Sequence, residues 1–220
     1  MSENATATAV LAPQAESVFR GLWASVFYAP TKPPKSVVVC ATNPGEGSTA
    51  MACGLALAGV GRAEGASVAL VDLNLRSPAV DSRLRLSNGA GASDVLTGQA
   101  DLDTALQRVG PGRLDVLTAG NVPDRLLEVL QVDGLRRMLG ELETRYDHVV
   151  VDTAPVNQYP DAQVLAELVG AVVLVARFRH TPREALLQAK RRLETSGARI
   201  LGTVLNQRTY PIPRFLYHRV

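Results

Sequence analysis

The chain has 220 residues, a formal net charge of +2, 46% hydrophobic residues and 20% charged residues. This composition is typical of a globular domain with its own core, and it excludes a disordered chain and a disulfide-stapled miniprotein. No apolar run approaches the ~20 residues that span a bilayer, and no basic segment precedes an apolar one at the N-terminus, so we expect a cytoplasmic protein. Cys40 and Cys53 sit in apolar segments, which favours reduced, buried thiols.

Residues 1–35 are predicted to form a tail, an amphipathic helix and a Pro-rich connector. Over Glu16–Tyr28 two apolar series recur every four residues. The series are Val18, Leu22, Val26 and Phe19, Trp23, Phe27. Prolines from position 30 onward end the helix. The helix either packs on the rest of the chain or docks a neighbouring subunit through its aromatic residues.

From residue 36 the pattern changes to short, continuous apolar runs that alternate with helical stretches. Such runs are typical of parallel strands buried on both faces, and the alternation predicts βαβ units. We therefore expect an α/β fold over residues 36–208, a doubly wound, mostly parallel sheet flanked by helices, and a tail over 209–220. The predicted strands are Ser36–Ala41, Val68–Val71, Leu114–Leu117, His148–Val151, Ala171–Ala176 and Ile200–Leu205. The predicted helices are Ser48–Val60, Leu126–Arg145, Asp161–Leu168 and Pro182–Ser196.

The first strand leads directly into the loop Thr42–Thr49 (TNPGEGST) and then a helix. A strand, a Gly-containing loop and a helix N-terminus form an anion site, because backbone N–H groups and the helix dipole point at the phosphates. The usual phosphate loop reads G-x-x-x-x-G-K followed by Ser or Thr. Here Gly47 fits that pattern, but Ser48 stands at the lysine position and Thr42 at the first glycine position.

Acidic residues follow two later strands, Asp72 after Val68–Val71 and Asp152 after His148–Val151. Both fall where ligands bind in open α/β sheets. Acids at that edge, beside a Ser or Thr of the phosphate loop, can hold Mg²⁺ directly or through water. A single strand-end Asp is as often a cap for a helix or turn. The order of the three features favours the metal.

These motifs resemble the cytoplasmic P-loop domain of bacterial tyrosine kinases that regulate capsule and exopolysaccharide synthesis. That family is a branch of the partitioning-type P-loop ATPases. Its pattern is PGEGKST, then D-x-D-x-R, then DTPP. The matching segments are Pro44–Ala50 (PGEGSTA), Asp72–Arg76 (DLNLR) and Asp152–Pro155 (DTAP). The resemblance extends from about Phe19 to Asn206 and implies a fold of the P-loop NTPase type.

The resemblance implies ATP or ADP with Mg²⁺ as cofactors. It implies nucleotide contacts at Pro44, Gly45, Glu46, Gly47, Ser48, Thr49 and Ala50, and at Asn206 near the base. It places Mg²⁺ at Thr49, Asp72 and Asp152, with Asp152 holding a metal-bound water. The implied catalytic residues are Asp72, Asp152 and Asn74, which takes the place of an Asp proposed to help accept the tyrosine proton.

Two departures from the family pattern predict weak phosphoryl transfer with nucleotide binding retained. Ser48 cannot neutralise phosphate charge as lysine does, and Asn74 cannot act as a general base. Arg76, Arg179 or an arginine of a neighbouring subunit are candidates to replace the missing charge. We favour a degenerate, regulatory tyrosine kinase-like protein of exopolysaccharide biosynthesis and export, a pseudokinase. The alternatives are an active tyrosine autokinase, a partitioning or localisation-type ATPase, and a scaffold that binds no nucleotide.

The resemblance also implies partners: a membrane polysaccharide co-polymerase (a chain-length regulator) and further copies of this chain, but no nucleic acid. The protein would reach the inner face of the membrane through that partner. Of the family's E-x-x-R-x-x-R subunit contact only Arg20 remains, and of its C-terminal tyrosine cluster only Tyr210 and Tyr217. From Arg177 onward ten Arg or Lys residues face two Glu. This basic segment either meets phosphates, acidic partners or anionic lipid, or is a solvated helix face.

Overall fold

The computed structural model describes residues 13–29, 31–60, 65–110 and 112–207. Its strands are β1 (Ser36–Ala41), β2 (Val68–Leu73), β3 (Leu106–Val109), β4 (Leu114–Leu117), β5 (His148–Thr153), β6 (Ala171–Arg177) and β7 (Arg199–Asn206). They form one sheet in the order β3-β4-β2-β5-β1-β6-β7. Every neighbouring pair is parallel except β3 and β4, which are antiparallel. The predicted α/β fold with a mostly parallel sheet is confirmed.

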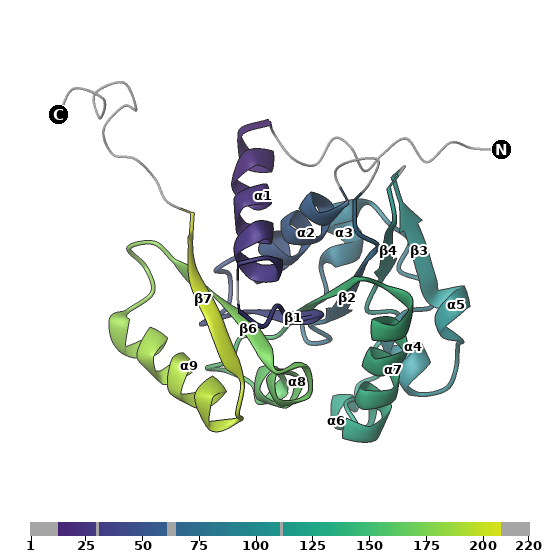
Figure 1. Ribbon diagram of the computed structural model, residues 1–220. Helices are drawn as coiled ribbons and strands as arrows, with labels where there is room; N and C mark the ends of the chain where they lie inside the picture. The colour runs from purple at the N-terminus through teal and green to yellow at the C-terminus, as the bar shows by residue number, and fades with distance from the viewer. Residues whose placement is uncertain (1–12, 30, 61–64, 111, 208–220) are drawn as a thin grey trace.

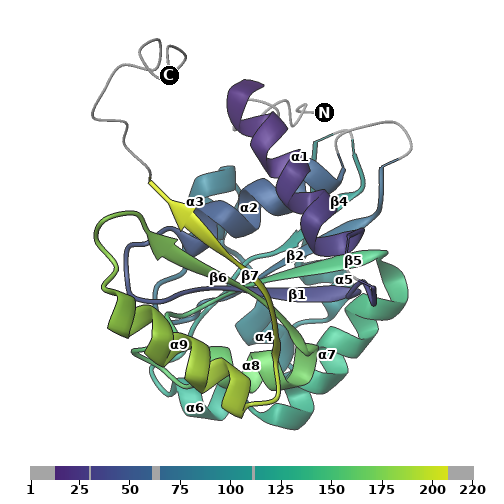
Figure 2. The same ribbon diagram turned by 60° about the vertical axis from the view of Figure 1, so that its left-hand side comes forward.

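Helices cover both faces of this sheet (Figures 1 and 2). On one face lie α1 (Pro13–Phe27), α2 (Ser48–Gly59) and α3 (Val80–Leu84). On the other lie α4 (Ala92–Leu96), α5 (Leu102–Ala105), α6 (Leu126–Val129), α7 (Val132–Arg145), α8 (Asp161–Val169) and α9 (Arg183–Thr195). The central strands contribute side chains to the cores on both faces of the sheet, because successive side chains of a strand point to opposite faces. Val37 and Val39 join the core beneath α1 to α3, whereas Val38 and Cys40 join the opposite core.

The aromatic stripe of α1 packs on its own chain. Phe19, Trp23 and Phe27 are buried, and their rings lie over α2 and the start of β5. Two glycines of α2 make room for them, since a Cβ on Gly54 or Gly59 would lie 2.2 Å or 2.4 Å from the Phe19 and Trp23 rings, respectively. The stripe is therefore a packing surface, and its aromatic residues are not available to another subunit.

Three expectations about the elements were wrong. The single helix over Leu126–Arg145 is two helices, because the backbone at Leu130 and Gln131 leaves the helical conformation and lets α6 and α7 pack on different clusters. The last strand, expected to be buried on both faces, is an edge strand in which Leu205 is 57% exposed. Strands β2 and β5 each run two residues further than expected, so Asp72 and Asp152 lie within the strands. The antiparallel β3 and the short helices α3 to α5 were not predicted.

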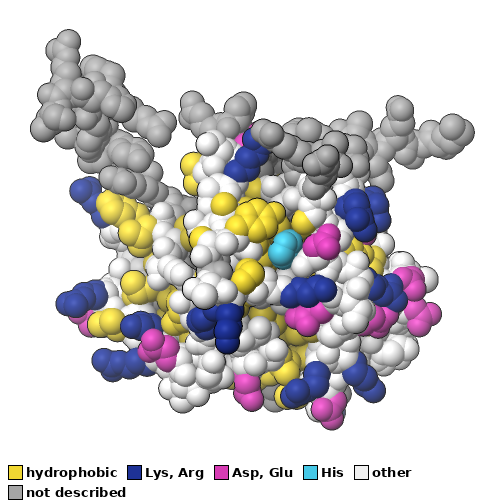
Figure 3. All heavy atoms as spheres, viewed as in Figure 1, with side chains coloured by type: hydrophobic (Ala, Val, Ile, Leu, Met, Phe, Trp, Pro, Cys, Tyr) yellow, Lys and Arg dark blue, Asp and Glu magenta, His cyan; other side chains and the backbone are white. Residues whose placement is uncertain are grey.

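Two further expectations concern thiols and surface charge. Cys40 and Cys53 are free and buried, as expected. In the space-filling view, Lys and Arg side chains are interspersed with Asp and Glu side chains (Figure 3). On α9, for example, Lys190 pairs with Glu194 at 3.5 Å. Between residues 177 and 207, however, seven Arg or Lys residues outnumber two Glu residues, so the described part of this segment is basic and its role stays a prediction.

Candidate functional site

The loop between β1 and α2 has the backbone of an anion-binding loop. Gly45 and Gly47 have φ values of +76° and +93°, a left-handed conformation that glycine adopts at little cost. Helix α2 begins directly afterwards at Ser48, so the unpaired N–H groups of its first turn face the loop. Gly47 also needs to be small, because a Cβ there would lie 2.4 Å from Asn206 Nδ2. The loop's shape therefore matches what its sequence predicts.

Hydrogen bonds of Glu46 connect the phosphate loop to the rest of the protein. It is 4% exposed, and its carboxylate accepts hydrogen bonds from the Asn43 N–H at 3.1 Å and from Thr181 Oγ1 at 2.6 Å. From β7, Asn206 Nδ2 donates to the Glu46 carbonyl at 2.8 Å, and the Gln207 amide donates to the Gly45 carbonyl at 3.3 Å. Glu46 therefore turns its side chain away from the space where phosphates would lie. Asn206, expected near a base, ties the loop to β7.

The three residues expected around Mg²⁺ come together. Asp72 and Asp152 are direct register partners on the neighbouring strands β2 and β5, and both are fully buried. Thr49 Oγ1, in the first turn of α2, donates to Asp152 Oδ2 at 2.5 Å. A hydroxyl and two carboxylates from three distant parts of the chain thus meet beneath the loop.

Asp72 also caps a helix. Its Oδ1 accepts the Asn74 N–H at 3.0 Å, and its Oδ2 accepts the Ala79 and Val80 N–H groups at 3.1 Å each. These bonds fix the start of α3 to the end of β2. Burial raises the pKa of Asp72, the three backbone hydrogen bonds oppose that rise, and the nearby Asp81 carboxylate adds to it. Asp72 therefore caps a helix, as a strand-end Asp often does, and it also belongs to the acidic pair.

The pKa of Asp152 is raised more strongly than that of Asp72. Burial raises its pKa well above the ordinary value, and the negative charge of Asp72 raises it further, while hydrogen bonds from Thr49 and Ser48 offset part of the rise. No described group donates to its buried Oδ1, and the same is true of the buried Asn74 Oδ1. A bound cation would stabilise this pair of buried carboxylates, one of which has an oxygen without a hydrogen-bond partner among the described residues.

The donor set fits Mg²⁺. This ion prefers hard oxygen ligands, and proteins commonly hold it through one or two carboxylates while substrate phosphates and water complete the octahedron. Thr49, Asp72 and Asp152 supply oxygens only. Within the described ranges no group of three or more His, Cys, Asp or Glu side chains is arranged to hold a metal. A phosphate ligand would therefore have to complete this coordination sphere.

A cavity of about 250 Å³ opens in front of the loop. Residues of the predicted site that line it are Pro44, Gly45, Gly47, Ser48, Thr49, Ala50 and Asn74. The remaining predicted residues, Glu46, Asp72, Asp152 and Asn206, do not line it and lie behind the loop or beneath it. Among the polar and aromatic side chains that line it, sequence reasoning missed four, which carry no motif of their own: Ser77, Arg83, Gln158 and Tyr159.

Of the two arginines named as substitutes for lysine, one lines the cavity. Arg76 does so, but its Nε and Nη2 donate to the two oxygens of buried Asp161 at 2.7 Å and 3.1 Å. Its guanidinium also lies 4.1 Å from the Tyr159 ring centroid. Arg179 is exposed, does not line the cavity, and has its guanidinium 5.4 Å from the Phe178 ring centroid. The charge of Arg76 is therefore already matched inside the protein.

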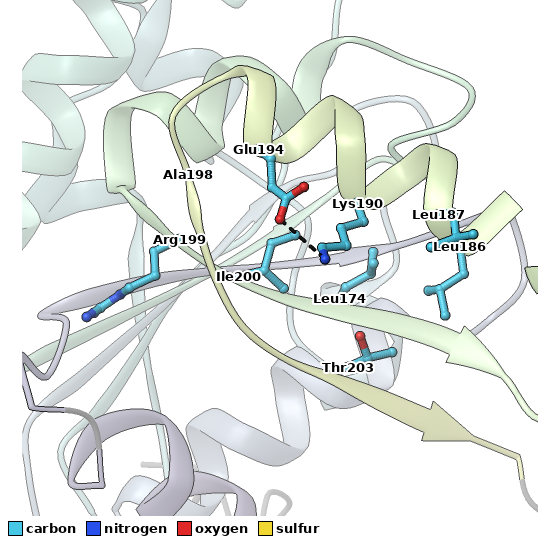
Figure 4. A pocket seen from close by; sticks show the side chains of 9 residues that line it. All are labelled: Leu174, Leu186, Leu187, Lys190, Glu194, Ala198, Arg199, Ile200 and Thr203. Atoms are coloured by element: carbon cyan, nitrogen blue, oxygen red, sulfur yellow. Dashed lines mark ion pairs between the residues drawn. The ribbon is translucent and has the colours of Figure 1, made fainter. Parts of the chain in front are cut away.

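A second hollow, of about 560 Å³, lies between α9 and the strands β6 and β7 (Figure 4). Leucine and isoleucine side chains line it, and the Lys190–Glu194 ion pair lies at its side. It contains no residue of the phosphate loop and neither of the paired acids. Although its volume is greater, this hollow is therefore not the site that the sequence predicts.

The chain is similar in sequence to tyrosine-protein kinases of bacteria. It is 34% identical over 172 residues to the tyrosine-protein kinase YwqD of Bacillus subtilis, covering 78% of this chain and 72% of that protein. It is 32% identical over 196 residues to the tyrosine-protein kinase etk of Escherichia coli, covering 89% of this chain but 27% of that protein. No protein-family model matches the chain.

Solved structures agree with this. The kinase domain of Escherichia coli tyrosine kinase ETK has a TM-score of 0.84 and 29% identity, with 96% of this chain and 85% of that chain covered. The cell division ATPase MinD of Pyrococcus furiosus has a TM-score of 0.66 at 21% identity, a likeness of fold alone. The expected P-loop NTPase type of fold is confirmed. Together with the identity to YwqD over most of both proteins, these likenesses show that the chain belongs to the family of bacterial tyrosine-protein kinases.

Proposed function

We propose that this chain is a degenerate member of its family, which binds ATP or ADP with Mg²⁺ and transfers phosphoryl groups weakly or not at all. It would regulate the biosynthesis of a bacterial exopolysaccharide or capsule. One observation carries the proposal: Ser48 lines the cavity at the position of the family's lysine, while the glycine loop and the Thr49, Asp72 and Asp152 cluster are all in place.

In this proposal binding and chemistry use different residues. Backbone N–H groups from Gly45 to Thr49 hold the phosphates, and Thr49, Asp72 and Asp152 hold Mg²⁺. The metal would neutralise charge on the phosphates. The lost lysine contact would weaken binding by roughly 1.5–3 kcal/mol, the usual contribution of a hydrogen bond to a charged group. Asn74 has no basic group with which to accept a tyrosine proton, so phosphoryl transfer would suffer more than binding.

Calorimetric titration tests the binding half of the proposal. ADP and ATP are titrated into the protein with and without Mg²⁺, and Thr49→Val serves as a variant that loses only the hydroxyl next to the acids. Mg²⁺-dependent binding in the micromolar range, weakened in the variant, supports the proposal. No binding at millimolar nucleotide would mean that the fold is kept as a scaffold.

Mass spectrometry after incubation with Mg²⁺ and ATP tests the catalytic half. We expect no phosphate on Tyr210 or Tyr217, which lie outside the described residues. The second candidate function, an active tyrosine autokinase, is favoured by the arginines that line the cavity. Phosphate on either tyrosine that disappears in Asp72→Asn would establish it. This substitution keeps a side-chain oxygen to accept N–H groups from the start of α3.

We propose that a membrane polysaccharide co-polymerase, a chain-length regulator, is the partner, and that the protein works at the inner face of the membrane through it. The support is the family alone. Among the described helices none has the length and apolarity needed to cross a bilayer. Co-purification of a tagged copy with a candidate co-polymerase, with and without nucleotide, tests the partner. Sedimentation analysis tests whether copies of the chain self-associate.

A further inference from the structure

An arginine that the family pattern does not predict lines the cavity in front of the loop. We propose that Arg83, on α3, provides the positive charge for the nucleotide phosphates that Ser48 does not provide. The inference rests on the proposed function, since it assumes that nucleotide binds in this cavity. It adds the residue on which that binding depends.

The position of Arg83 follows from the acidic pair. The side chain lines the same cavity as Ser48 and Thr49. It sits one helical turn after Val80, whose N–H is bound by Asp72 Oδ2 at 3.1 Å. The carboxylate proposed to hold Mg²⁺ therefore also anchors the short helix that carries the arginine. Helix α3 packs against α2, the helix that begins at the end of the phosphate loop.

The charge of Arg83 is uncompensated. Its side chain is exposed, and within the described part of the chain no carboxylate pairs with it and no hydrogen bond is formed by its guanidinium. Its charge reaches α2, because it opposes the rise that burial and the acidic pair impose on the pKa of the Cys53 thiol. Arg76, the other cationic side chain at the cavity, is instead held by both oxygens of Asp161.

A guanidinium suits this task. Its planar fork can donate two parallel hydrogen bonds to a phosphate and stays charged at every physiological pH. Because Arg83 belongs to α3 and not to the loop itself, it would add a contact to the phosphates beyond those of the loop. A ligand without phosphates would gain nothing from it. The inference therefore predicts a selective effect on the affinity for charged ligands.

The test is calorimetric titration of ADP with Mg²⁺ into matched variants. Arg83→Gln should weaken binding by about 10-fold to 100-fold, the range for a lost charge-assisted hydrogen bond. Arg85→Gln is the control: it removes the same charge from an exposed arginine two residues further on, which does not line the cavity. It should change affinity by less than about 3-fold, since solvent and salt screen its charge. Arg83→Lys keeps the charge but not the planar fork, so it should lose less affinity than Arg83→Gln does.

A rescue experiment distinguishes charge from structure. Ser48→Lys restores the family's lysine, so it should recover the ADP affinity of the Arg83→Gln protein and make position 83 unimportant. Two results would overturn the inference and leave the proposed function standing. One is an ADP affinity of Arg83→Gln equal to that of the unaltered protein. The other is a failure of Ser48→Lys to restore the ADP affinity of Arg83→Gln. Absence of ADP binding to the unaltered protein overturns the proposed function itself, and Arg83 with it.

Discussion

Replacing Asp152 with Asn should stabilise the protein when no nucleotide or Mg²⁺ is present. Asp152 is fully buried, stands opposite Asp72 in the sheet register, and has one oxygen that no described group contacts. An amide of the same shape keeps an oxygen for the Thr49 hydroxyl and removes the negative charge. A residue that we propose binds metal is thus expected to cost stability in the empty site, as functional residues often do.

The size of the effect follows from the distance between strands. Neighbouring strands lie about 4.8 Å apart, so two carboxylates at ~5 Å repel by roughly 3 kcal/mol at an effective dielectric constant of 20. Protonation of the carboxylate pair limits that repulsion. In the variant, an amide oxygen accepts a weaker hydrogen bond from Thr49 than a carboxylate oxygen does, which costs about 1 kcal/mol. The net gain is about 1–2 kcal/mol, which for a protein of this size raises the melting temperature by about 2–8 °C.

The assay is thermal unfolding followed by circular dichroism across a pH series. Burial and Asp72 raise the pKa of Asp152 in the folded state, so its ionisation costs stability as pH rises above the ordinary Asp value of 3.8. The advantage of Asp152→Asn should be largest near neutral pH and vanish as pH falls toward that value. Asp161→Asn is the contrasting control, because that buried carboxylate is paired with Arg76 and its loss should lower the melting temperature. The reasoning would be refuted if Asp152→Asn had a lower melting temperature than the unaltered protein at neutral pH. It would also be refuted if the difference between the two melting temperatures did not change with pH.

Three further predictions concern the site and the core. The contribution of Mg²⁺ to nucleotide affinity should grow as pH rises above the ordinary Asp value of 3.8, because Asp152, proposed to hold the metal, must be ionised and its pKa is raised. Calorimetric affinities that do not change across a pH series would contradict this. Trp23→Ala should lower the free energy of unfolding by about 3–5 kcal/mol in urea titrations, and a loss under ~1 kcal/mol would mean that α1 is not packed on α2. Gly47→Ala should weaken nucleotide binding, since alanine is strained at a φ of +93° and its Cβ would displace the Asn206 amide. The matched control is Gly170→Ala, which has a similar positive φ of +77° and open space around it, and should leave binding unchanged.

Sequence reasoning succeeds where the information is local. The strand β1 and the loop after it are contiguous, and their shape depends on glycines at fixed positions. Asp72 and Asp152 are visible because each interrupts an apolar run, and the edge of a parallel sheet then brings them together. The apolar stripe of α1 predicts a helix, although its spacing does not reveal what the helix packs against.

The rest depends on contacts that no local pattern records. Thr181 lies 135 positions from Glu46, and nothing near it in the sequence indicates that it braces the loop. Strand β7 has the composition of a central strand, so its place at the sheet edge is decided by topology. The apolar period of Leu126–Arg145 continues through Leu130, where packing on separate clusters overrides the helical propensity.

The order of strands also fixes when the phosphate loop can form during synthesis. Strand β1 is the first to be made, yet its sheet neighbours are β5 and β6, and Ser36 pairs with Val149 far along the chain. Until the ribosome has released about two thirds of the sequence, β1 has neither of its neighbouring strands. Sheets built from such distant pairs fold slowly and are exposed to aggregation on the way. The cavity at the glycine loop is therefore among the last parts of the protein to appear, and nascent chains stalled before β5 should depend on chaperones.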